Sequence, residues 1–229
     1  MNRNTGMNAG QIIGTMNGLQ VMGLDIAKHV FQLHTVDMGT GEIVNVQIKR
    51  AKVLEHFANK ATCLIAMEAC GGAHHWAREF SALGHSVRLL HAKVVRPFVA
   101  GNKTDAADAR GIWLAVQQPG VKFVGIKSAA QQATLTLHRQ RQLLMKMRDM
   151  QVNALRGLLY EFGAVFAKST RAMLGEVEKA LEALAGQLPQ MVRDSLRDQV
   201  GRIKALNADM LAIEKRLAVQ LRQDPQMKR

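Results

Sequence analysis

The sequence predicts an α/β fold, a mixed sheet with helices, followed by an α-helical coiled-coil stalk. Two observations carry this prediction. In the first 127 residues, short apolar or alternating runs are separated by turn residues and helical stretches, which is typical of a mixed sheet with helices. From Ser128 onward, apolar residues recur every three or four positions with charges between them, as in long amphipathic helices. We therefore expect a disordered leader at 1–18, an α/β domain at 19–127 and a helical coiled-coil region at 128–229.

The α/β domain begins with three runs that predict consecutive strands. LQVMGLDIA occupies Leu19–Ala27, VFQLHTVD occupies Val30–Asp37, and EIVNVQIK occupies Glu42–Lys49. The turn residues MGTG at Met38–Gly41 separate the last two runs. Short connections of this kind favour an antiparallel meander.

Helices and strands alternate after the meander. The continuous apolar run Ala61–Glu68 predicts a strand that is buried on both faces. Around it we expect one more strand and four helices, namely helices at Arg50–Lys60, from Gly71–Gly72 to about Leu83, at Ala92–Gly101 and from Asp105 to about Gln118, with a strand at His85–His91.

The helical region predicts a hairpin or stalk rather than a second catalytic domain. A long amphipathic helix is expected at Ser128–Phe162, a second ending near Gly186, and a third from Pro189 to about Gln223. Apolar residues of the third helix step by three or four over more than four heptads, at Val192, Leu196, Val200, Ile203, Leu206, Met210, Ile213, Leu217 and Leu221.

The charge of the chain points to a polyanionic partner. The formal net charge is +13 and the pI is near 10.3, and a basic excess of this size favours nucleic acid. Aromatic residues make up only 4% of the chain, so base stacking is not expected to be its main mode of contact. Residues 1–127 carry 14 basic and 8 acidic side chains, and residues 128–229 carry 17 and 10.

The cysteines and the lengths of the apolar runs indicate in which cellular compartment the protein is expected. Cys63 and Cys70 do not form a C-x-x-C pair, so they are interpreted as buried thiols in a reducing cytosol. No run approaches 18 apolar residues, so no membrane span is expected.

Four acids form the candidate site. Asp105 and Asp108 lie three apart in an Ala-rich run, so a helix would project both from one face. Asp25 lies near the end of the first expected strand and Glu68 ends the fourth. If these two strands are parallel neighbours, Asp25 and Glu68 meet at one sheet edge, where α/β folds bind ligands. The simpler alternative is a helix N-terminus that Thr104 caps and the two aspartates favour electrostatically.

Clustered carboxylates repel one another unless a divalent cation lies between them. Two metal ions can stabilise the attacking and leaving oxygens of a phosphodiester. The pattern therefore indicates phosphoryl-transfer or nuclease-like chemistry that depends on Mg²⁺ or Mn²⁺.

Three motifs carry a family resemblance. GLDIAK at Gly23–Lys28, MEACGG at Met67–Gly72 and NKTDAADAR at Asn102–Arg110 resemble the N-terminal half of the DEDD transposases of bacterial insertion sequences, family one-ten and its eleven-eleven subgroup. The resemblance covers roughly Leu19–Phe162. It implies a RuvC-like RNase H fold, a recombinase activity guided by a structured bridge RNA, and a catalytic metal site at Asp25, Glu68, Asp105 and Asp108.

The resemblance also implies partners. We expect DNA, the guide RNA and a second copy joined through the coiled coil, in the bacterial cytoplasm near the nucleoid. Basic residues expected to contact nucleic acid are Lys28, Lys103, Arg110, Arg139 and Arg141. Family members continue into a domain with a Ser nucleophile, which none of the serines at 128, 169 and 195 matches. Full strand exchange is therefore not expected of residues 1–229 alone.

Two other functions fit the same residues. A stand-alone RNase H-like nuclease or Holliday-junction resolvase would use the four acids hydrolytically, and a non-catalytic nucleic-acid scaffold would use a metal only to hold its fold. A sugar-kinase-type ATPase is set aside because the chain has no Gly-rich phosphate loop. His74 and His75 follow Glu68 closely and could assist the metal site or touch phosphate, although a surface role is the simpler interpretation.

Overall fold

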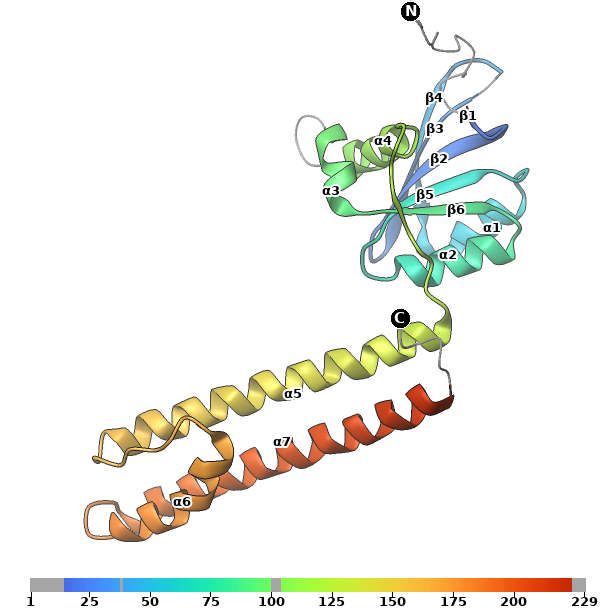
Figure 1. Cartoon of the computed structure of the whole chain (residues 1–229). Coiled ribbons are helices and arrows are strands. Elements are labelled where there is room, and N and C mark those ends of the chain that lie inside the picture. The colour runs from blue at the N-terminus through green and yellow to red at the C-terminus, as the bar shows by residue number, and fades with distance from the viewer. Residues whose placement is uncertain (1–14, 38, 100–103, 224–229) are drawn as a thin grey trace, which may run out of the picture. The chain divides into compact units, whose positions relative to one another are not determined.

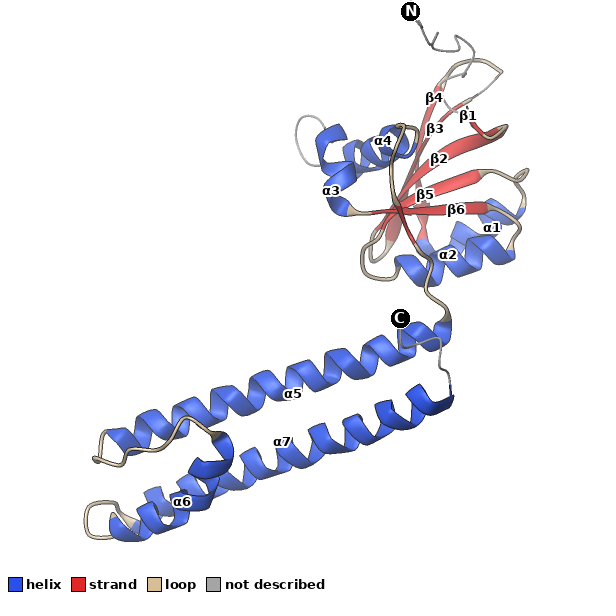
Figure 2. Cartoon of the chain, viewed as in Figure 1, coloured by secondary structure: helices blue, strands red, loops and turns tan. Residues whose placement is uncertain are grey.

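The computed structural model describes residues 15–37, 39–99 and 104–223. The chain divides into two compact units, Met1–Ala129 and Ala130–Arg229. The first unit contains a mixed sheet and its covering helices, and the second contains only helices in its described residues (Figures 1 and 2).

The sheet of the first unit has the order β4-β3-β2-β5-β6-β7, with β1 paired to β2. Strands β2, β3 and β4 form the antiparallel meander, β5 and β6 continue parallel to β2, and β7 is antiparallel to β6. The mixed sheet and the parallel pairing of the first and fourth expected strands are thus confirmed. The strands are β1 Thr15–Met16, β2 Leu19–Ile26, β3 Val30–Val36, β4 Ile43–Lys49, β5 Leu64–Glu68, β6 Ser86–Leu90 and β7 Phe123–Val124.

Helices cover both faces of this sheet (Figure 1). One face packs against α1 and α2 around Phe31, Phe57 and Trp76, all of them buried. The other face packs against α3 and α4 around Ile112 and Trp113. The helical segments of the unit are η1 Arg50–Lys52, α1 Val53–Ala58, α2 Ala73–Ala82, α3 Ala92–Val95, η2 Arg96–Phe98 and α4 Asp105–Val116.

Alternation along the central strands decides which side chains face α4. In β5, Leu64 and Ala66 belong to the core under α4, whereas Ile65 and Met67 belong to the core under α2. The strand is therefore buried on both faces, as its apolar run predicted.

Three local expectations need correction. The leader is shorter than 1–18, because Thr15–Met16 forms β1, and residues 1–14 lie outside the described residues. Asn17 and Gly18 both have positive φ, 54° and 76°, and an Asn-Gly pair in this conformation is a strong hairpin signal. The helix expected at 92–101 is shorter, because the chain tightens into η2 at Pro97 and Val99 is extended. Strand β7 was not predicted.

The second unit is a helical hairpin in which α5 and α7 run antiparallel (Figure 1). The helices are α5 Ala129–Tyr160, α6 Thr170–Ala183 and α7 Gln190–Gln223, close to the predicted bounds. Their shared core joins Leu155 and Leu159 of α5 to Val177 and Leu181 of α6 and to Ile203 of α7. Between α5 and α7, Arg141 pairs with Glu214 at 2.7 Å and the Gln199 side chain donates to the Gln151 carbonyl at 3.0 Å.

The predicted apolar seam of α7 is confirmed as a buried face, because every seam residue is buried or half-buried. Much of it packs within the chain, on α5 and α6. On α5 the predicted helix is present, but not all of its apolar residues are buried. Leu143, Met147 and Leu158 are 58%, 45% and 50% exposed, because they lie on the side of α5 that the hairpin core leaves uncovered.

Candidate active site

Asp25 and Glu68 leave neighbouring strands at the same end. In the parallel pair β2–β5, Leu24 is the register partner of Met67, so the next residue on each strand is one of the two acids. Side chains alternate along β2, and Gly23 lies against α4, so Asp25 two residues later also faces the α4 side.

Close packing brings α4 onto this part of β2. A Cβ on Gly23 would lie 2.7 Å from the Cβ of Trp113, far inside van der Waals contact. The Trp113 indole N–H donates to the Val21 carbonyl at 3.1 Å. Gly23 therefore allows the helix that carries Asp105 and Asp108 to lie directly on the strand that carries Asp25.

The first turn of α4 presents Asp105 and Asp108. Thr104 is extended and caps the helix, because the Ala107 N–H donates to its hydroxyl at 3.2 Å. The predicted cap is thus confirmed, and capping and ligand binding are compatible uses of one helix start.

All four acids line one cavity of about 590 Å³. They come from β2, β5 and α4, three segments that are separate in the sequence. The remaining lining residues come from the ends of the same strands and from α3 and η2, namely Ile26, Cys70, Ala92, Val95, Arg96 and Val99.

Mutual repulsion is evident in the ionisation of the site. Burial, and then the charges of Asp108, Asp105 and Glu68, raise the pKa of Asp25 to about 6. Burial, with Glu68 and Asp25, also raises the pKa of the Cys70 thiol. Among the described residues, none of the four acids forms an ion pair. A cavity of uncompensated carboxylates favours cations.

The donor set fits a divalent cation chemically, because carboxylate oxygens are the ligands that Mg²⁺ and Mn²⁺ prefer. No three His, Cys, Asp or Glu side chains of the described residues stand together as a ready-made metal cage. The acids thus share one cavity without closing around a common point. Because the negative charges of the four carboxylates repel one another, an open arrangement is expected when no cation lies between them.

The basic residues singled out from the sequence have different surroundings. Lys28 is exposed in the β2–β3 turn, and Arg110 is exposed on α4. Burial, and then the positive charge of Arg110, lower the pKa of His34. Lys103 lies outside the described residues. In the second unit Arg139 is exposed and Arg141 is paired with Glu214.

Arg96 is the cavity residue that the sequence analysis missed. It follows α3 and lines the cavity with the four acids. The sequence feature that could have indicated it is its position shortly after the end of β6, which runs parallel to the strands of Asp25 and Glu68. His74 and His75 are absent from the described lining, since His74 contacts Lys127 and His75 lies 3.6 Å from Glu79.

Comparison with known proteins agrees with this geometry. Residues 22–163 match the family model DEDD_Tnp_IS110, described as "Transposase". The chain is 39% identical over 212 residues to "Probable family 20 transposase" of Pseudomonas aeruginosa, which covers 92% of this chain and 63% of the relative. It is 36% identical over 180 residues to the transposase for insertion sequence element IS1111A of Coxiella burnetii, which covers 78% of this chain and 50% of the relative.

A transposase for insertion sequence element IS1328 of Yersinia enterocolitica is 36% identical over 148 residues, 65% of this chain and 44% of the relative. The chain thus spans about half of the length of the curated relatives it matches. The family match covers more than half of the chain and includes all four acids, so the chain belongs to the IS110-type DEDD transposase family.

Proposed function

We propose that the first unit carries the metal-dependent phosphoryl-transfer site of a DNA transposase. The observation that carries this proposal is the convergence of Asp25, Glu68, Asp105 and Asp108 on one cavity. In this proposal the four acids hold Mg²⁺ or Mn²⁺ and are the catalytic residues for DNA strand cleavage and transfer.

Asp25 and the two aspartates of α4 contribute to this site in different ways. A bound divalent cation supplies Lewis-acid stabilisation of the charge on a phosphodiester. Asp25, with its pKa near 6, is partly protonated near neutral pH, so it releases a proton as a cation enters. Asp105 and Asp108 are fixed by the Thr104 cap and the first turn of α4, which orients both carboxylates before substrate arrives. Arg96 is the cavity cation that would contact the DNA phosphate.

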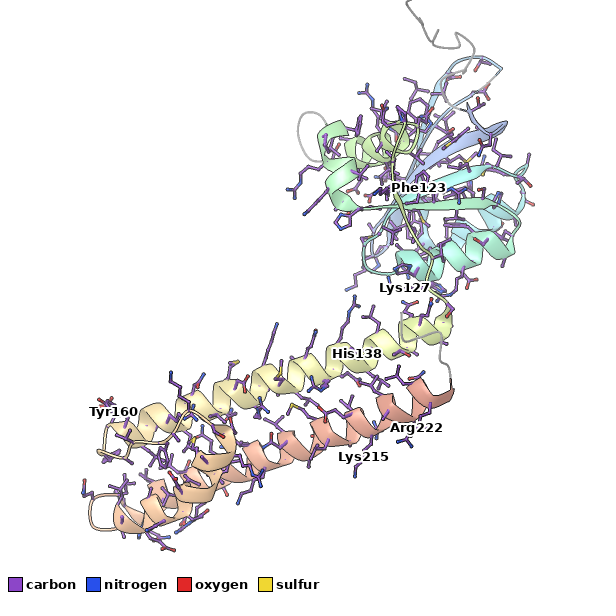
Figure 3. The ribbon with its side chains drawn as sticks, in the orientation of Figure 1. Phe123, Lys127, His138, Tyr160, Lys215 and Arg222 are labelled. Atoms are coloured by element: carbon purple, nitrogen blue, oxygen red, sulfur yellow. The ribbon has the colours of Figure 1, made fainter. Side chains whose placement is uncertain are left out.

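The second unit is proposed to bind nucleic acid backbone, including a structured guide RNA. Several of its basic side chains are exposed and have no ion pair among the described residues, among them Arg139, Lys146, Arg202, Lys204 and Lys215. Lys215 and Arg222 are labelled on α7 in Figure 3. Such cations bind phosphates with little dependence on base sequence. Lys28, Lys103 and Arg110 are proposed to do the same in the first unit.

Self-association is proposed to use the outer face of α5 rather than the α7 seam. Leu143, Met147 and Met150 are 58%, 45% and 71% exposed, and Leu158 continues the row. The steps of four and three residues from Leu143 to Met150 match a coiled-coil seam, Leu158 lies beside its continuation, and exposed apolar rows of this kind mark interaction sites. A second copy of the chain is the proposed occupant.

The site of action is proposed to be bacterial nucleoid DNA in the cytoplasm. No helix of the described residues is long and apolar enough to cross a membrane. DNA is the substrate that the family name of the relatives supports.

Purified chain tests the proposal directly. We expect one discrete structured RNA to copurify with the chain, and Mg²⁺ binding to be lost in Asp105→Asn. Glu42→Gln is the matched control, because Glu42 is an exposed acid outside the cavity. Efficient hydrolysis of branched DNA without RNA would instead favour a stand-alone nuclease or resolvase. RNA binding with no metal-dependent cleavage, even after addition of the part of a full-length relative that lies beyond the matched region, would favour a scaffold.

A further inference from the structure

A second cavity lies in the first unit, and it is cationic rather than acidic. It measures about 770 Å³ and is lined by residues from the β2–β3 turn, the start of β3, the end of β4, η1, α1 and the start of α2, namely His29, Val30, Lys49, Arg50, Ala51, Leu54, His75 and Trp76. Within the described part of the chain, no carboxylate lines it, and it shares no lining residue with the acid cavity.

Arg50 is held over an aromatic pair. Its guanidinium carbon lies 4.9 Å from the Trp76 ring and 5.8 Å from the Phe31 ring. The two rings contact edge to face with centroids 4.8 Å apart, and both are buried. Stacking fixes the plane of a guanidinium and leaves its N–H edge available for a ligand.

The other cations around Arg50 are also uncompensated. Lys49 and Arg50 are exposed and form no ion pair among the described residues. His29 is exposed as well, and the Arg50 backbone N–H donates to its carbonyl at 2.9 Å. Only His75 of the lining has a carboxylate partner among the described ion pairs, because its ring lies 3.6 Å from Glu79. Convergent cations without a carboxylate partner favour an anion, and a planar Arg fork suits phosphate.

The topology places this cavity at the same sheet end as the acids but under the opposite face. Val30 at the start of β3 pairs with Lys49 at the end of β4, and β3 is antiparallel to β2, whose last residues are Asp25 and Ile26. Trp76 and Phe31 belong to the core beneath α2, whereas the acids lie on the α4 side.

We propose that the cavity around Arg50 and Lys49 binds a backbone phosphate of a nucleic-acid strand, separately from the four acids. The apolar wall of Val30, Ala51 and Leu54 accommodates the adjoining sugar. The inference rests on the proposed function only in taking nucleic acid as the partner. It requires neither a metal ion nor the acid cavity.

The test is binding of labelled single-stranded and duplex oligonucleotides, of DNA and of RNA, to the whole chain in EDTA at several salt concentrations. Arg50→Gln is expected to weaken binding about tenfold, the effect of losing one charged hydrogen-bonded contact. The salt slope should fall by about 0.9 for duplex DNA or about 0.7 for single strands. Lys49→Gln, which leaves the Arg50 stack intact, should weaken binding in the same direction.

Lys60→Gln is the matched control. Lys60 is exposed and follows α1 just before β5 begins, so it lies toward the opposite end of the sheet from Glu68. It is expected to alter neither the affinity nor the salt slope beyond the loss of one distant charge. An Arg50→Gln effect no larger than that of Lys60→Gln, with Lys49→Gln also matching the control, overturns the proposal.

The nucleic-acid arms identify the source of the phosphate. A loss of affinity for RNA alone assigns the cavity to a guide strand, a loss of affinity for DNA alone assigns it to the substrate, and equal losses assign a backbone contact common to both.

Asp105→Asn separates this inference from the proposed function. If Mg²⁺ binding depends on Asp105 but oligonucleotide binding is indifferent to Arg50 and Lys49, only the second site is wrong. If the reverse holds, only the metal site is wrong.

Discussion

Gly23 of β2 lies so close to Trp113 of α4 that no side chain fits between them. The Cβ of an alanine at position 23 would lie 2.7 Å from the Cβ of Trp113 and 2.8 Å from its backbone nitrogen. Neither atom is at the end of a flexible side chain, so the helix itself would have to move. The distance between Asp25 and the two aspartates of α4 therefore depends on this glycine.

Gly23→Ala is predicted to destabilise the first unit by about 1–3 kcal/mol, the usual cost of overpacking a core. It should also weaken Mg²⁺ binding, because α4 carries half of the acids. Urea unfolding and metal titration measure the two effects. Gly71→Ala is the control, since a Cβ at Gly71 meets nothing within 4 Å. Equal stability of the two variants would contradict the packing argument.

The pH dependence of metal-free stability is predicted to carry the signature of Asp25. Its pKa is about 6 in the folded chain, above the usual aspartate pKa of 3.8, so the ionised carboxylate opposes folding. Stability should rise as pH falls from above 6 toward 4, and Asp25→Asn should remove that rise. Thermal unfolding in EDTA from pH 4 to 8 measures the difference between variant and wild type. Parallel curves would mean that Asp25 ionises normally.

His34 is predicted to act in the opposite direction. It is 4% exposed, its Nδ1 has no hydrogen-bond partner among the described residues, and burial followed by the Arg110 charge lowers its pKa. His34 therefore binds a proton more readily in the unfolded chain than in the folded chain, so stability falls as pH drops below about 6.5. His34→Leu should flatten this acid limb in the same unfolding series. An unchanged limb would show that His34 can be protonated without unfolding.

Substitutions at different positions of the helical unit are predicted to affect self-association and hairpin folding separately. Met150→Lys places a charge on the exposed row of α5 and should lower the mass measured by light scattering without changing helicity. Ile203→Asp places a charge in the core shared by α5, α6 and α7 and should instead reduce helicity, at a cost of several kcal/mol. Unchanged mass in Met150→Lys would remove the α5 face as the interface.

The sequence predicted the sheet and helices well because their signals are local. Apolar alternation, the run Ala61–Glu68 and the α7 repeat each lie within one segment. Proximity of Asp25 to Glu68 could be predicted only conditionally, because it depends on the parallel pairing of two strands whose register partners are 43 residues apart in the sequence. Once that pairing exists, the register brings the two acids together.

What the sequence missed depends on long-range packing. β7 is two residues long and is defined by its pairing with β6. The exposed row on α5 could not be told from its buried row, because both recur at helical spacing. The Arg50 cavity joins six segments, and no motif in any one of them indicates it. The Asn17–Gly18 turn was readable, since Asn-Gly is a recognised hairpin signal.

Isothermal titration of Mg²⁺ into metal-free protein tests the central claim most directly. Wild type and Glu42→Gln are predicted to bind with the same affinity, and Asp105→Asn is predicted to lose at least one site. Thermal unfolding without metal should show Asp105→Asn at least as stable as wild type, because one repelling charge is removed. Equal Mg²⁺ binding by Asp105→Asn and wild type would contradict a metal site built from the four acids.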